Sequence, residues 1–82
     1  MRIMIRNVQV KNDLLSAQIE LPQRSVCQLS ISSSEGRLLH KLFVQLDIGE
    51  NTVRLPFRIA EKGRYVLSLL MGAEVTQEPF AL

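Results

Sequence analysis

The stretch ISSSEGRLLHKLFVQLDIGENTVRLP, residues 31–56, has two turn signals separated by runs rich in apolar side chains. The first signal is Glu35-Gly36, and the second is Gly49-Glu50-Asn51. Glycine readily takes the positive φ angles that tight hairpin turns require. We therefore expect three strands joined by two turns here. The stretch holds almost no reactive side chains, which favours a structural role for it.

Alternation of apolar and polar side chains continues in both directions along the chain. Apolar residues at every second position are typical of half-buried strands. This pattern predicts further strands at 15–21, 27–31, 65–71 and 74–82. Pro56 marks the strand at 53–57 as an edge strand or a strand end, because proline lacks the backbone N–H of a central strand. Residues 58–62 could form a short helical turn that ends at Gly63.

Two segments depart from simple alternation. Before and after Arg6-Asn7, the apolar residues of the first strand fall on opposite parities, which indicates a β-bulge or a switch between sheets. Leu38 to Leu46 is apolar on both parities, which implies either a bulge or a second buried face.

Seven short strands at this spacing are typical of a sandwich or barrel, and no helical periodicity persists. Eighty-two residues are enough for one hydrophobic core only. We expect a single domain over 1–82, an all-β, small antiparallel Ig-like β-sandwich of about seven strands.

Composition excludes several classes of protein. Cys27 is the only cysteine, so a disulfide framework or a multi-cysteine zinc site is excluded. It lies on the parity of its apolar neighbours, so we expect a buried thiol. The net charge is only +2 and basic residues are scattered, which argues against a nucleic-acid partner. No apolar run is long enough to span a membrane.

Side chains that could carry chemistry do not converge in the sequence. His40 has no second ligand or nucleophile at a suitable spacing, and we interpret it as a strand residue facing solvent or a sandwich edge. Calcium binding by Asp47 and Glu50 does not match the spacing of an EF-hand. Ser32-Ser33-Ser34 lacks the context of a nucleophile and is interpreted as a loop. We predict no catalytic, cofactor or metal site, and a protein that is not an enzyme.

The turn and strand motifs resemble a known family. Gly36-Arg37-Leu38-Leu39, Gly49-Glu50-Asn51, Leu55-Pro56 and Gly63-Arg64-Tyr65 are similar to motifs of the C-terminal sorting domains of type IX (por) secretion system cargo in Bacteroidetes. Those domains are Ig-like seven-stranded sandwiches. The family-motif positions are Gly36, Arg37, Gly49, Asn51, Gly63 and Tyr65. Independently of the family, Tyr65 could bury its ring and bond its hydroxyl to a backbone group, as in a tyrosine corner.

The resemblance implies a non-enzymatic sorting and surface-attachment module that the secretion machinery recognises. The candidate recognition strand contains Thr76, Gln77, Glu78 and Phe80. We expect this strand to be separable from the scaffold, so that deletion of 76–82 leaves much of the fold. The expected partner is a protein, either the secretion machinery or the rest of a larger chain at the cell surface.

Two alternatives stay open. The chain could be an Ig-like accessory or interaction domain of a larger surface protein. It could instead be a stand-alone small β-sandwich acting through oligomerisation, cytoplasmic if Met1 is the native start. A homodimer through an edge strand is allowed, with the strand that ends at Pro56 and the C-terminal strand as the candidate edges.

Overall fold

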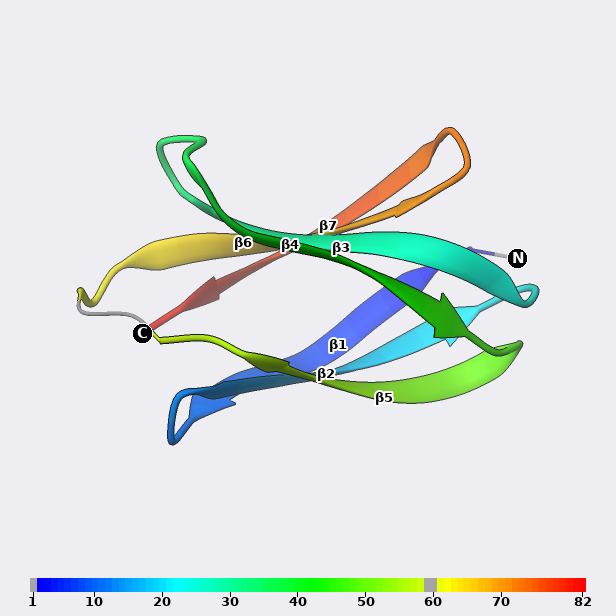
Figure 1. Cartoon of the computed structure of the whole chain (residues 1–82), viewed down its shortest axis with the longest axis horizontal. Coiled ribbons are helices and arrows are strands. Elements are labelled where there is room, and N and C mark those ends of the chain that lie inside the picture. Colours follow the sequence, from blue (N-terminus) through cyan, green and yellow to red (C-terminus); the bar gives the residue numbers. More distant parts are fainter. Residues whose placement is uncertain (1, 59–60) are drawn as a thin grey trace.

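The computed structural model describes residues 2–58 and 61–82 and is all-β (Figure 1). Its seven strands are β1 Met4–Lys11, β2 Leu14–Leu21, β3 Ser25–Ser33, β4 Leu38–Leu46, β5 Gly49–Pro56, β6 Arg64–Met71 and β7 Glu74–Ala81. The predicted fold class and strand number are confirmed. The helical turn considered for 58–62 falls on residues 59–60, which lie outside the described residues.

The strands form two antiparallel sheets that pack face to face. One sheet has three strands in the order β1-β2-β5, and the other has four in the order β4-β3-β6-β7. Figure 1 shows the two sheets as layers whose strands cross at an angle, as the twist of packed sheets requires. Consecutive strands β2 and β3, β4 and β5, and β5 and β6 lie in different sheets, which gives the sandwich its Ig-like character.

The core is the space between the sheets, and it is filled by alternate residues of each strand. The central strands β2, β3 and β6 contribute most of its fully buried side chains, among them Leu15, Leu29 and Leu67. Within the described residues no polar or charged residue is buried. Burial of each such leucine contributes roughly 1.5–3 kcal/mol relative to exposure. The period-two pattern therefore corresponds directly to the core face.

A β-bulge explains the change of parity in β1. Arg6 pairs with Gln18 and Gln9 with Ser16, so β1 has one more residue than β2 between these pairs. Asn7 takes the irregular conformation, with φ of 55°. The bulge turns Val8 back toward the core, where it packs beside the buried residues. Of the two expectations for this segment, the bulge is confirmed.

A second bulge lies at the beginning of β4. Ile31 pairs with His40 and Ser32 with Leu38, so Leu39 has no separate partner on β3. Beyond the bulge, Leu42, Val44 and Leu46 face the core, and Phe43 faces outward with 67% of its surface exposed. The expectation of a bulge is therefore confirmed, and no second face of β4 is buried.

Candidate functional site

The glycine motifs form the turns between strands. Gly36 has a φ of 88° in the β3–β4 turn, and Gly49 has a φ of 90° where β5 begins. Residues with a side chain rarely adopt this backbone conformation, so both positions require glycine. The Arg37 backbone N–H donates to the Ser33 hydroxyl at 3.2 Å. These motif positions hold the hairpins in shape.

Asn51 connects the β4–β5 turn to the neighbouring strand. Its Oδ1 accepts a hydrogen bond from the Asp47 N–H at 3.0 Å, and its Nδ2 donates to the Asp47 carbonyl at 2.9 Å. The same Nδ2 lies 3.2 Å from the Gly49 carbonyl and 3.3 Å from the Ile19 carbonyl on β2. One side chain thus satisfies backbone groups of the turn and of β2, which is a structural role.

Tyr65, the second residue of β6, forms a tyrosine corner. Its ring is buried, and its hydroxyl donates a 2.7 Å hydrogen bond to the carbonyl of Glu61. The ring packs edge-on against Phe57, with centroids 5.8 Å apart, and stacks on Phe80 at the same distance. Just before it, the Gly63 carbonyl accepts a hydrogen bond from the Leu82 N–H. The expected hydrogen bond is therefore present.

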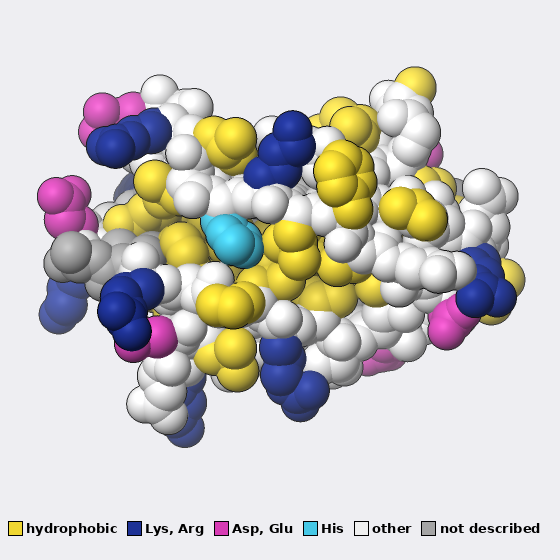
Figure 2. Space-filling view, viewed as in Figure 1, with side chains coloured by type: hydrophobic (Ala, Val, Ile, Leu, Met, Phe, Trp, Pro, Cys, Tyr) yellow, Lys and Arg dark blue, Asp and Glu magenta, His cyan; other side chains and the backbone are white. Residues whose placement is uncertain are grey.

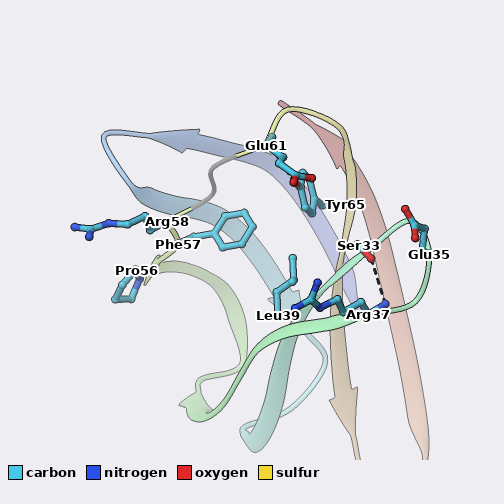
Figure 3. A pocket seen from close by; sticks show the side chains of 9 residues that line it. All are labelled: Ser33, Glu35, Arg37, Leu39, Pro56, Phe57, Arg58, Glu61 and Tyr65. Carbon is cyan, nitrogen blue, oxygen red and sulfur yellow. Dashed lines mark hydrogen bonds between the residues drawn. The ribbon is translucent and has the colours of Figure 1, made fainter.

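A pocket of about 400 Å³ lies beside this corner (Figure 3). Its lining residues are Ser33, Glu35, Arg37, Leu39, Pro56, Phe57, Arg58, Glu61 and Tyr65. Arg37 lies next to Leu39, while Arg58 extends away from the other side chains (Figure 3) and stands 3.8 Å from the Asp13 carboxylate. The Tyr65 hydroxyl at this pocket already bonds to the Glu61 backbone. The pocket therefore has the rings of Phe57 and Tyr65 in its wall and exposed charged side chains around it.

The acidic residues considered for calcium are engaged with arginines. Asp47 lies 3.5 Å from Arg24, and Glu50 lies 3.3 Å from Arg6, which also contacts Glu20 at 3.3 Å. In the described part of the chain, no three His, Cys, Asp or Glu side chains are close enough together to hold a metal ion.

The remaining reactive side chains are His40 and Cys27. His40 is on the inner face of the edge strand β4 and is half-buried. Cys27 is 1% exposed, which confirms the expected buried thiol. Burial raises the pKa of the Cys27 thiol above its ordinary 9.0, and a hydrogen bond to Ser25 opposes this.

The candidate recognition strand β7 has one inner and one outer face. Phe80 pairs with the buried Tyr65, Glu78 with Leu67 and Thr76 with Leu69, so these three face the inner side of the sheet. Gln77 is exposed on the outer side. Phe80 also packs against Phe57, with centroids 6.0 Å apart. Deletion of 76–82 would remove this aromatic packing and most of the strand that pairs with β6 on that side, so the structure argues against a separable strand.

The prolines of β5 and β7 both face open edges of the sheets. The Leu82 N–H donates to the Gly63 carbonyl, so Leu82 and every second residue before it direct their backbone groups toward β6. Pro79 is at one of the positions between them, and its nitrogen points away from β6. By the same reasoning from the Phe57 N–H bond to the Asp13 carbonyl, the nitrogen of Pro56 points away from β2. Each proline removes one donor from an exposed edge, a known defence against unwanted strand pairing. Both candidate edge strands are confirmed as edges.

A third edge was not singled out from the sequence. Directly after β3, the Ser34 N–H donates to the Arg64 carbonyl of β6. This bond fixes the alternation along β3, so the backbone groups of Ile31, Leu29 and Cys27 bond with β4. The backbone groups of Lys41, Phe43 and Gln45 therefore point outward from β4. The signal in the sequence was Phe43 on the wrong parity for the core.

No protein-family model matches the chain, and no curated protein matches it. The described residues contain no helix that is long and apolar enough to cross a membrane.

Proposed function

We propose that this chain is a non-enzymatic protein-recognition module of the sorting and surface-attachment kind, recognised by type IX secretion machinery. The proposal places it at the cell surface as part of a larger protein. It rests on the turn motifs that resemble the sorting family and on the Ig-like sandwich in which those motifs form the turns. The observation that carries most weight is the tyrosine corner at Tyr65, which sits at the Gly63-Arg64-Tyr65 motif.

Recognition would use the outer side of β7. The N–H of Gln77 points away from β6, and its side chain is exposed, so a partner strand could pair there without disturbing the core. Pro79 limits such pairing to the part of β7 before it. The inner face, with Phe80, supports the strand from behind.

The test is export of a reporter protein fused to the N-terminus of this chain in a Bacteroidetes host. We expect the reporter at the surface in a host with the por machinery and inside the cell in a host without it. Gln77→Pro removes one outward backbone donor and the side-chain hydrogen bond from Gln77 to Ser68. It leaves the β6–β7 backbone hydrogen bonds in place, so export should fall severalfold. Thr52→Pro, which changes the corresponding outward position on β5, is the matched control. A reporter retained in both hosts would refute the proposal.

The second candidate is an Ig-like interaction or accessory domain that works by association with another protein. The exposed outer side of the four-stranded sheet, which includes Phe43 and Val75, favours this candidate. This candidate predicts that export of the reporter does not depend on the chain. It also predicts that Phe43→Ser weakens binding to the partner protein.

A further inference from the structure

β4 is the least protected edge of the sandwich. On the opposite side, the edge strands β1 and β7 lie against each other, and β1 is interrupted by the bulge at Asn7. β5 and β7 each expose a proline nitrogen. β4 has its bulge at Leu39, and from Lys41 to Leu46 it is regular and contains no proline. Its outward N–H and C=O groups form an uninterrupted template for another strand.

The same edge exposes apolar surface. Phe43, in the middle of the regular segment, is 67% exposed, and Leu39 is 41% exposed. Figure 2 views the molecule from the side of β4 and β5 and shows hydrophobic side chains around His40 on this face. Large exposed aromatic rings beside unpaired backbone groups mark an association surface more often than a solvated one.

We propose that two copies of this chain associate through β4, paired antiparallel about a two-fold axis at Phe43. In this register Lys41 of one copy is opposite Gln45 of the second copy, and the two Phe43 rings are opposite each other. All three outward-facing residues of β4 then form hydrogen-bonded pairs, each pair exchanging two backbone bonds. No like charges are directly opposite, and the aromatic pair adds packing on the outer face.

The charges of β5 favour a second copy over an unrelated strand. One turn joins the end of β4 to the start of β5. Phe43 lies three residues before the end of β4, and Thr52 lies three residues after the start of β5, so both are equally far from the turn along the chain. A two-fold axis perpendicular to the sheets at Phe43 therefore passes near Thr52 as well. It brings Glu50 of one copy toward Arg54 of the second copy, and the reverse.

These two residues are suited to such a contact. Both are exposed on the outer face of β5. Among the described residues, Arg54 has no carboxylate within ion-pair distance, and Glu50 shares Arg6 with Glu20. In the register that pairing through β4 imposes, the β5 edges of the two copies therefore carry complementary charges. Opposite charges across an interface fix its register and exclude other partners.

The test is the molar mass of the purified chain by sedimentation equilibrium over a range of concentrations. We expect a species of twice 9.3 kDa. Phe43→Lys places ammonium groups together at the axis and should raise the dimer dissociation constant on the order of tenfold or more. Val75→Lys, at an exposed position on β7, is the matched control and should leave the mass unchanged.

A charge swap tests the β5 contact. Arg54→Glu should weaken the dimer by bringing carboxylates together, and the double variant Glu50→Arg with Arg54→Glu should restore it. Circular dichroism checks that each variant is folded. A monomer at every concentration, as expected if the β4 edge takes a strand of another protein, would overturn the proposal. So would a dimer that is sensitive to Val75→Lys but not to Phe43→Lys. Export plays no part in these measurements, so their outcome is independent of the sorting proposal.

Discussion

The hydroxyl of Tyr65 donates a 2.7 Å hydrogen bond to the carbonyl oxygen of Glu61, four residues earlier in the chain. The bond connects the start of β6 to the connection from β5, and so joins the two sheets at one end of the sandwich. The acceptor belongs to the backbone, so the identity of the side chain at position 61 does not enter the interaction.

Tyr65→Phe should lower the free energy of unfolding by about 1 kcal/mol, because it removes one hydrogen bond and keeps the aromatic packing. Urea denaturation followed by circular dichroism measures the change. Glu61→Ala is the control and should have little effect. An equal loss in both variants would show that the Glu61 carboxylate, rather than its carbonyl, supports the corner.

Asn51→Ala should destabilise the protein by about 1–3 kcal/mol, since it leaves several backbone groups of the β4–β5 turn without their side-chain partner. Asn51→Asp keeps the acceptor for the Asp47 N–H and loses the donor, so it should also destabilise. Thr52→Ala, at the next and exposed position, is the matched control for thermal unfolding. An unchanged melting temperature in Asn51→Ala would contradict the structural role given to this side chain.

Phe80→Ala should cost about 2–3 kcal/mol, at or below the low end of the range for core aromatics, because the ring is only partly buried. The loss should be smaller when Phe57 is already alanine, since the two rings are in contact. A double-mutant cycle in urea measures this coupling. Strict additivity of the two single losses would mean that β7 is not held by the aromatic cluster.

Cys27 should make stability depend on pH in the alkaline range. Its pKa is raised in the folded state, so the unfolded chain loses the thiol proton first as pH rises above about 9.0. The folded state then binds more protons, and the free energy of unfolding must fall with rising pH. Comparison with Cys27→Ala over pH 8 to 10 isolates this contribution from those of lysine and tyrosine. A parallel pH dependence in both proteins would contradict it.

The same burial should protect the thiol from reagents. Alkylation of Cys27 by iodoacetamide in the native protein should be slower than in urea by orders of magnitude, because the residue is 1% exposed and its thiol is less often ionised. Mass spectrometry of timed samples gives both rates. Equal rates would show that β3 opens readily.

The sequence by itself determined the elements. Alternation located the strands, because a side-chain period of two is fixed by the pleat. Glycines at 36 and 49 located turns, because positive φ is a local property of the backbone. The change of parity at Arg6-Asn7 indicated either a bulge or a switch between sheets, and the structure has the bulge.

Only the tertiary structure decided which strands are neighbours and which edges stay open. The order β4-β3-β6-β7 brings together strands that are distant in sequence, and pairing between such strands leaves no local periodic signal. The mixed parity of β4 was resolved only when β3 fixed its register, which turned Leu42 toward the core and left Phe43 exposed. The contacts of Phe80 with Phe57 and Tyr65 form only when the sheets pack, so the sequence did not reveal them. For this reason the sequence alone placed Phe80 in the candidate recognition strand. Local backbone preferences are encoded residue by residue, whereas an edge is defined by the absence of a neighbour, and that depends on the whole fold.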